Sequence, residues 1–195
     1  GDSLEKIAVE KAGIIKENVP IIIGETQSEV QHVFVNKAKE LGSKILFADE
    51  ALNANEVSDK DYLILKILKH GELLFDNLHL DLTGGYQKKN ILTVLASVEQ
   101  LKYQGFNISD KHIYSAIQNV KSLTGLMGRW QKLSDKPLTY CDVGHNKDGI
   151  HEVIEQIMRT HHRHLHFVLG MVNDKDVSGV LSLLPNNATY YFCKA

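Results

Sequence analysis

The chain has 195 residues, of which 43% are hydrophobic, so it can bury the core of one compact domain or two small ones and is too apolar for a disordered tail. Its 22 basic and 24 acidic residues leave a formal net charge of -2, which excludes the strong positive field that binds nucleic acids or anionic membranes. No apolar stretch approaches the roughly 20 residues of a membrane helix, and the opening residues lack a signal-peptide pattern. We therefore expect a cytoplasmic protein with no nucleic-acid or membrane partner.

The first 120 residues alternate helix and strand signals. A helix is predicted from Asp2 to Gly13, with Asp2 as its N-cap and Glu5 three residues later, as in a capping box. The chain then predicts a strand at 20–24, a helix at 28–41, a strand at 44–48, a loop at 53–61, strands within 62–82 around a turn at 69–72, and helices at 87–102 and 109–120. This alternation is typical of the α/β class.

A domain boundary is predicted within residues 122–134, which show no periodicity and contain two glycines. We place it between residues 124 and 125. Beyond it, strands at 138–143, 165–171 and 189–193 alternate with helices at 147–160 and 177–184. Apolar strands joined by helices favour a Rossmann-like, mostly parallel sheet. Three parallel strands make a small sheet, so we expect the domain to continue past residue 195.

The cysteines and the histidine cluster carry little functional signal. Cys141 and Cys193 lie in strand-like runs and are predicted to be reduced thiols in the core. The histidines of residues 161–166 leave a helix and enter a strand, so their rings should diverge, which disfavours a metal site.

Lys11 occupies an unusual position in the first helix. The apolar stripe Leu4, Ile7, Ala8 continues to Lys11, so its amine is predicted to point toward the core. Burial disfavours the charged amine, and a neutral amine can add carbon dioxide and become a carbamate, an oxygen ligand of the kind magnesium prefers. The alternative, which the helix pattern alone favours, is that the ammonium reaches water from the edge of the stripe.

Two further motifs place polar residues beside glycine turns. Gln87 and Asn90 follow a glycine pair and lie at i and i+3 on one helix face, where their amides can bind a nucleobase or cap the helix. The residues alone favour capping. In Gly128-Arg129-Trp130, Arg129 can form a salt bridge, and Trp130 is interpreted as a packing residue.

The run from Leu138 to Asn146 is the most informative. An apolar strand ends in Asp142, and a turn leads to His145 and Asn146 at a helix start. Such helix starts bind anionic ligands in α/β folds, where a carboxylate can hold a ribose hydroxyl and a histidine can contact phosphate. Alternatively, Asn146 caps the helix and Asp142 hydrogen-bonds the turn, and both interpretations can hold together. A similar strand-to-helix turn carries Lys175, and these residues alone are consistent with a solvated loop and a helix cap at Asp176.

These motifs, in this order, resemble the folylpolyglutamate synthase/dihydrofolate synthase family of the Mur ligase superfamily. The opening run resembles the family's central-domain signature, whose carbamylated lysine falls on Lys11. Gln87 and Asn90 match the family's H-Q-x-x-N, in which the asparagine contacts ATP and where Tyr86 stands in place of the histidine. Arg129 matches the arginine of P-G-R-F/W, which reaches the ATP phosphates.

The remaining matches lie in the last third of the chain. Asp142, His145 and Asn146 match the family's D-x-A-H-N-P, with Gly144 in place of alanine. Residues 174–176 match its D-K-D, which contains Lys175. By this resemblance, residues 1–124 are the end of a central ATPase domain and residues 125–195 are the first part of a C-terminal glutamate-ligase domain.

The resemblance implies an ATP-dependent ligase that adds L-glutamate to dihydropteroate, folylpolyglutamate or both through an acyl phosphate. It implies ATP binding by Gln87, Asn90, Arg129, Asp142 and Asn146, a Mg²⁺ ion on carbamylated Lys11, and catalytic roles for Lys11, His145 and Lys175. No G-x-x-x-x-G-K-[ST] motif occurs, so we expect an N-terminal P-loop part of the same polypeptide as a partner, and an inactive chain without it. The alternatives are a Mur-type peptidoglycan amino-acid ligase and a non-catalytic α/β binding module.

Overall fold

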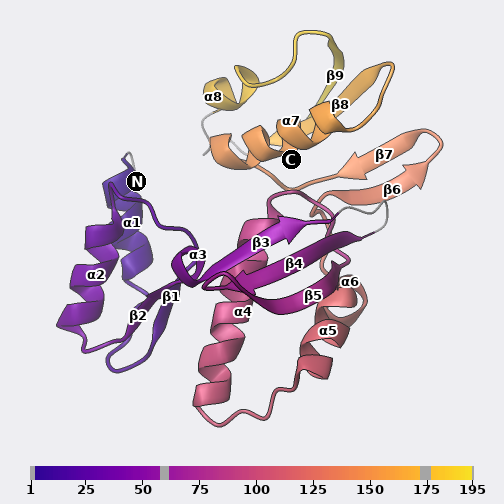
Figure 1. The fold of residues 1–195 in the computed structure, drawn as a ribbon. Coiled ribbons are helices and arrows are strands. Elements are labelled where there is room, and N and C mark those ends of the chain that lie inside the picture. The colour runs from indigo at the N-terminus through magenta and orange to yellow at the C-terminus, as the bar shows by residue number, and fades with distance from the viewer. Residues whose placement is uncertain (1–2, 58–61, 172–176, 195) are drawn as a thin grey trace. The chain divides into compact units, whose positions relative to one another are not determined.

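The computed structural model describes residues 3–57, 62–171 and 177–194 and confirms the α/β class. The chain forms two compact units (Figure 1). The N-terminal unit comprises Gly1–Asp81 and Gln87–Asn119, and the C-terminal unit comprises Leu82–Tyr86 and Val120–Ala195. The assignment of residues 1–124 and 125–195 to an ATPase and a ligase domain stays a prediction. No helix among the described residues has the length and apolar character that a membrane span requires.

The N-terminal unit begins with a small α/β layer. It contains α1 (Leu4–Ala12), β1 (Ile21–Ile23), α2 (Gln31–Glu40), β2 (Ile45–Phe47) and the short α3 (Ala48–Ala51). Strands β1 and β2 pair in parallel, and α1 packs against α2. Ser3 caps α1 by accepting a hydrogen bond from the Lys6 N–H at 3.3 Å. The predicted cap is therefore displaced by one residue from Asp2, which lies outside the described residues, whereas the predicted helix end at Gly13 is confirmed.

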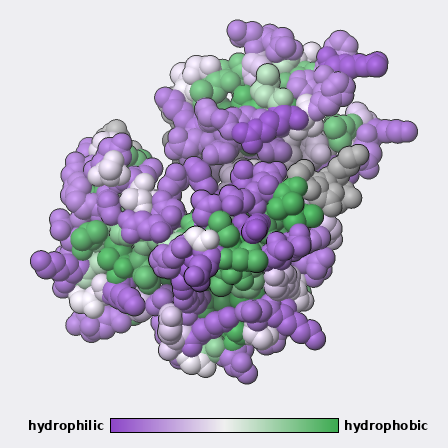
Figure 2. Space-filling model, viewed as in Figure 1, coloured by the Kyte–Doolittle hydropathy of each residue, from purple (hydrophilic) through white to green (hydrophobic). Residues whose placement is uncertain are grey.

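An antiparallel sheet follows in the order β3-β4-β5, made by β3 (Leu52–Glu56), β4 (Leu63–Lys69) and β5 (Glu72–Leu80). The prediction of a loop from residue 53 is wrong as far as residue 56, because β3 pairs with β4 although its own sequence has little strand propensity. The turn between β4 and β5 is confirmed and places His70 and Gly71 at positive φ. Hydrophobic surface is exposed over this sheet (Figure 2), where Leu73 and Leu74 of β5 are 55% and 42% exposed.

Two predicted helices support the sheet. Helix α4 (Gln87–Tyr103) packs against β3, and α5 (Asp110–Gln118) packs against β5. The core beneath them is aliphatic, with Leu65, Ile67 and Leu78 almost fully inaccessible to solvent. The predicted start of α5 is confirmed, because Ser109 caps it in a capping box with His112.

The C-terminal unit contains α6 (Val120–Thr124), β6 (Gln131–Asp135), β7 (Leu138–Cys141), α7 (Lys147–Arg159), β8 (Leu165–Met171), α8 (Val177–Leu181) and β9 (Ala188–Lys194). Strands β8 and β9 pair in parallel, as predicted. The expectation that β7 would join them is wrong, because β7 instead forms an antiparallel hairpin with β6. Strand β6 was not predicted, since most of its side chains are exposed and it lacks an alternating apolar pattern.

The core of this unit lies between α7 and the strands. Trp130, Val153 and Ile157 are buried together, and Tyr140, Ile154, Leu165 and Phe167 pack against them. Both cysteines are free thiols, but Cys141 is half-buried and Cys193 is exposed, so the prediction of two core thiols is wrong. In strand β9, the last strand of the described chain, Tyr191 and Phe192 are exposed to solvent.

Candidate functional site

Asp142, directly after β7, joins three segments of the C-terminal unit. Its Oδ2 accepts hydrogen bonds from the Tyr86 hydroxyl at 2.8 Å and from the Trp130 N–H at 2.7 Å. Its Oδ1 accepts a third from the Gly144 N–H at 2.8 Å. Hydrogen bonds to a carboxylate are stronger than those between neutral groups, so this half-buried side chain fixes the geometry around it. The predicted hydrogen bond to the turn is confirmed.

The Gly128–Trp130 turn carries Arg129. The Val143 N–H donates to the Gly128 carbonyl at 2.9 Å, and the Gly128 N–H donates to Gln131 Oε1 at 2.9 Å. Gly128 and Trp130 both have left-handed backbone conformations, with φ of 69° and 50°. For a tryptophan this conformation costs about 1–3 kcal/mol, so it requires support from its surroundings.

Trp130 receives that support from the core. It is 5% exposed and stacks on Tyr140 with ring centroids 4.6 Å apart and planes 14° from parallel. The interpretation of Trp130 as a packing residue is confirmed. Arg129, between two fixed neighbours, is half-buried, and its guanidinium forms no hydrogen bond or ion pair with another residue of the described chain. Its side chain is therefore available to an anion.

Asn146 and His145 lie at the start of α7, directly after the Asp142 turn. The Asn146 Oδ1 accepts the Gly149 N–H at 2.8 Å and caps α7, so the capping interpretation is confirmed. His145 is exposed, with Nδ1 lying 3.1 Å from the Val143 carbonyl oxygen. Because a carbonyl oxygen only accepts, this contact is a hydrogen bond when Nδ1 carries the proton, and a neutral ring then presents Nε2 as an acceptor.

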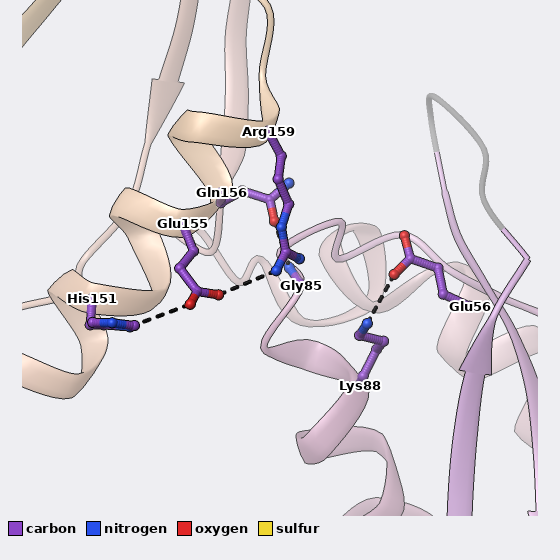
Figure 3. Close-up of polar contacts among 7 residues, drawn as sticks. All are labelled: Glu56, Gly85, Lys88, His151, Glu155, Gln156 and Arg159. Carbon is purple, nitrogen blue, oxygen red and sulfur yellow. Dashed lines mark hydrogen bonds and ion pairs between the residues drawn. The ribbon is translucent and has the colours of Figure 1, made fainter.

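Gln87 and Asn90 lie in the N-terminal unit, on the first turn of α4. They share one helix face, as predicted, and the Asn90 Nδ2 donates to Gln87 Oε1 at 2.8 Å. Gln87 is 4% exposed, whereas Asn90 is exposed. The adjacent Lys88 forms an ion pair with Glu56 of β3 at 3.0 Å (Figure 3), so the start of α4 is anchored to the sheet.

Lys11 does not point toward the core, and its exposure agrees with the alternative that its ammonium reaches water. The buried face of α1 is formed by Ala8 and Ala12, while Leu4 and Ile7 are 45% and 40% exposed. Lys11 is rotated about 100° from Ala12 around the helix axis, and it is exposed. Its side chain forms no hydrogen bond or ion pair within the described chain.

The described residues do not assemble a magnesium site. No group of three or more His, Cys, Asp or Glu side chains converges in residues 3–57, 62–171 and 177–194. Lys11 therefore belongs to no such group among the described residues, and its assignment as a carbamate depends on the resemblance alone. Lys175 lies outside the described residues, as do the flanking aspartates of its motif.

A surface hollow of about 300 Å³ lies between α7 and α8, away from the predicted residues. On α7 its charged side chains form a ladder, with Glu155 within 3.3 Å of Arg159 and 3.8 Å of His151 (Figure 3). These exposed charges pair with one another, whereas the polar groups of the Asp142 turn are held by three hydrogen bonds. We therefore place the candidate site at the Asp142 turn.

The comparisons with known proteins agree with the motifs. Residues 128–195 match the family model "Mur ligase, glutamate ligase domain". The chain is 30% identical to a dihydrofolate synthase/folylpolyglutamate synthase of Escherichia coli and 27% identical to one of Bacillus subtilis, over 99% and 94% of its length. The chain resembles the dihydrofolate and folylpolyglutamate synthases. The resemblance predicted from the motifs is thereby confirmed.

Solved structures show the same fold. An FPGS–AMPPCP–folate complex superposes with a TM-score of 0.85 at 22% identity, and a Mycobacterium tuberculosis folylpolyglutamate synthase complexed with ADP and AMPPCP superposes with 0.83 at 22% identity. Each comparison covers 98% of this chain but only 46% and 43% of those chains. The chain likewise spans 42% of both curated relatives named above, less than half of a synthase.

Sequence reasoning missed the part played by Tyr86. It registered this residue only as a departure from the histidine of the synthase motif. In the structure, the Gly84–Tyr86 segment forms two hydrogen bonds within the C-terminal unit, from the Tyr86 hydroxyl to Asp142 and from the Gly85 N–H to Gln156 Oε1 at 3.1 Å (Figure 3). Tyr86 and Asp142 are 56 residues apart, and no local pattern signals such a contact.

Proposed function

We propose that this chain is part of an ATP-dependent ligase that joins L-glutamate to dihydropteroate, to folylpolyglutamate or to both. The observation that carries the proposal is the Arg129 turn, because an arginine without an ion-pair partner in the described chain is held between two residues that are bonded to positions 142 and 143, shortly before α7. A planar guanidinium binds phosphate oxygens in a bidentate manner, and helix starts favour anions. The synthase relatives and their complexes with ATP analogues support the same assignment.

In the proposed reaction, a substrate carboxylate oxygen attacks the γ-phosphorus of ATP, and ADP leaves. The amine of L-glutamate then attacks the carbonyl carbon of the acyl phosphate, inorganic phosphate departs, and the amine loses a proton as the amide forms. Arg129 contributes by neutralising charge on the transferring phosphoryl oxygens. His145 is proposed to contact phosphate at the same turn through an Nε2–H, which requires both ring nitrogens to carry protons because Nδ1 donates to the Val143 carbonyl.

Asp142 retains the capacity to bind a ribose hydroxyl. A carboxylate oxygen accepts about two hydrogen bonds. Oδ2 already accepts two, from Tyr86 and Trp130, whereas Oδ1 accepts one, from Gly144. We assign the remaining position on Oδ1 to the nucleoside, with Gln87, Asn90 and Asn146 as the other proposed ATP contacts.

A role for Mg²⁺ is proposed only because the chain resembles the synthase family. When bound, Mg²⁺ would neutralise phosphate charge, and Lys11 would reach it as a carbamate. Because the described residues contain no convergent group of three or more His, Cys, Asp or Glu side chains, no step is assigned to the ion. Lys175 is proposed to line the ATP or glutamate crevice, and the cytoplasmic location also stays a prediction.

The test is glutamate-dependent ADP formation by a protein of the relatives' length that contains this chain. Dihydropteroate, a folylglutamate and a UDP-muramoyl substrate are compared, and the 195-residue chain is assayed in parallel. We expect turnover with one or both folate substrates and none with the chain alone. Turnover only with the muramoyl substrate would indicate a peptidoglycan ligase, and no turnover with any of them would indicate a binding module.

A further inference from the structure

We propose that Tyr86 and Asp142 are positioning residues that fix the Arg129 turn, in addition to any contact that Asp142 makes with a nucleotide. This inference rests on the proposed function only in that Arg129 is taken to bind phosphate. The positioning itself is a property of the C-terminal unit without any ligand.

The hydrogen bonds hold Arg129 from both sides. On one side, the Gly128 carbonyl is bound by the Val143 N–H at 2.9 Å. On the other, the Trp130 N–H is bound by Asp142 Oδ2 at 2.7 Å, the same oxygen that accepts the Tyr86 hydroxyl. Residues 142 and 143 therefore set the backbone on each side of Arg129, and Tyr86 holds the carboxylate in place.

Packing of the Gly84–Tyr86 segment supports the same conclusion independently. A Cβ atom added at Gly84 would lie 3.2 Å from Trp130 Cβ and 2.8 Å from the Tyr86 ring. One at Gly85 would lie 3.0 Å from Gln156 Oε1, which accepts the Gly85 N–H. The two glycines thus let the segment approach Trp130 and α7 closely enough for the Tyr86 hydroxyl to reach Asp142.

Trp130 provides a direct readout, because it is the only tryptophan in the sequence. We compare Tyr86→Phe and Asp142→Asn in the 195-residue chain by tryptophan emission and acrylamide quenching, without nucleotide. The matched controls are Tyr103→Phe, which removes an exposed hydroxyl bound to Glu99, and Asp148→Asn, which removes an exposed acid from the first turn of α7. Circular dichroism and unfolding midpoints establish that each variant is folded.

Both test variants should shift the Trp130 emission to longer wavelength and raise its quenching, with the larger shift in Asp142→Asn, and the controls should match the unmodified chain. An amide at position 142 necessarily presents its NH₂ group to one of the backbone N–H donors, whereas Tyr86→Phe removes a single donor. Unchanged emission in both folded test variants would overturn the proposal. If Asp142→Asn does not fold, the emission of Tyr86→Phe decides the question alone.

Steady-state kinetics separate the positioning role from the proposed function. They are measured in the ligase-length protein, which is the protein of the relatives' length that contains this chain. Tyr86→Phe should lower kcat in the presence of Arg129 and have little effect in an Arg129→Ala background, because the two changes act through one turn. Equal losses in both backgrounds would show that Tyr86 does not act through Arg129. Changed Trp130 emission with no ATP-dependent activity in the parent protein would retain the positioning role and overturn the proposed function instead.

Discussion

The turn that carries Asp142 and the helix that carries Lys11 hold their candidate residues in opposite ways. Asp142 is half-buried and receives three hydrogen bonds from its own unit, whereas Lys11 is exposed and has no side-chain partner in the described chain. The first arrangement is preorganised, since its polar groups are already oriented before a ligand binds. The Lys11 side chain, in contrast, is held by no other described residue, so a ligand would have to orient it. Substitutions at the two places should therefore differ in their effect on stability as well as on activity.

The largest effect is expected from Arg129→Ala. Loss of a cation that stabilises charge in the transition state should lower kcat by about 100- to 1,000-fold in the ligase-length protein, with a smaller change in the KM for ATP. The kcat of Arg129→Lys should lie between those of the parent protein and Arg129→Ala, because lysine keeps the charge but not the bidentate geometry. The exposed Arg163→Ala serves as control and should behave as the parent protein in steady-state assays.

Lys11→Ala should lower activity without lowering stability. Activity should fall by about 10- to 100-fold if the side chain serves a metal, while the free energy of unfolding should change by less than about 0.5 kcal/mol because Lys11 is exposed. Short carboxylic acids added to the assay should partly restore activity by replacing the carbamate. Lys39→Ala, at another exposed lysine, is the control, and activity of Lys11→Ala within a few-fold of the parent would exclude the carbamate.

Asp142→Ala should lower both stability and activity. It leaves the Trp130 and Gly144 N–H groups without their acceptor, which we expect to lower the stability of the 195-residue chain by about 1–3 kcal/mol. In the ligase-length protein it should mainly raise the KM for ATP, because a ground-state contact to the nucleoside is lost. Denaturant unfolding compares it with Asp148→Ala, which should stay within about 0.5 kcal/mol of the parent. Equal stability of the two variants would contradict the role of Asp142 as the centre of the turn.

The smallest effect is expected from Asn146→Ala. Removal of the N-cap of α7 should cost about 1 kcal/mol in unfolding experiments, because the Gly149 N–H loses its acceptor. Asn146→Ser restores a capping oxygen and should recover most of that stability. A stability loss that serine does not recover would assign Asn146 a role other than capping.

The sequence predicted well wherever the signal was local. The cap at Asn146, the bond from Gly144 to Asp142 and the apolar stripe of α7 all lie within a few residues of their partners, and helix α7 is observed at Lys147–Arg159. Strands β8 and β9 were found for the same reason, since each is a continuous apolar run.

Prediction failed where structure depends on distant partners. Strands β3 and β6 have little strand propensity and form because a neighbouring strand offers hydrogen bonds. Lys11 does not point toward the core because α1 buries its small residues, Ala8 and Ala12, rather than its larger ones. In the candidate site, the contact between Tyr86 and Asp142 required the fold, and no spacing in the sequence could have indicated it.

The most direct test of the nucleotide site is hydrogen exchange of the ligase-length protein with and without a non-hydrolysable ATP analogue. We predict slower exchange in residues 128–130 and 142–149 when the analogue binds, and a smaller effect in Arg129→Ala. Protection confined to the hollow between α7 and α8, around Met158 and Leu183, with none at residues 128–130, would contradict the assignment of the Asp142 turn to ATP.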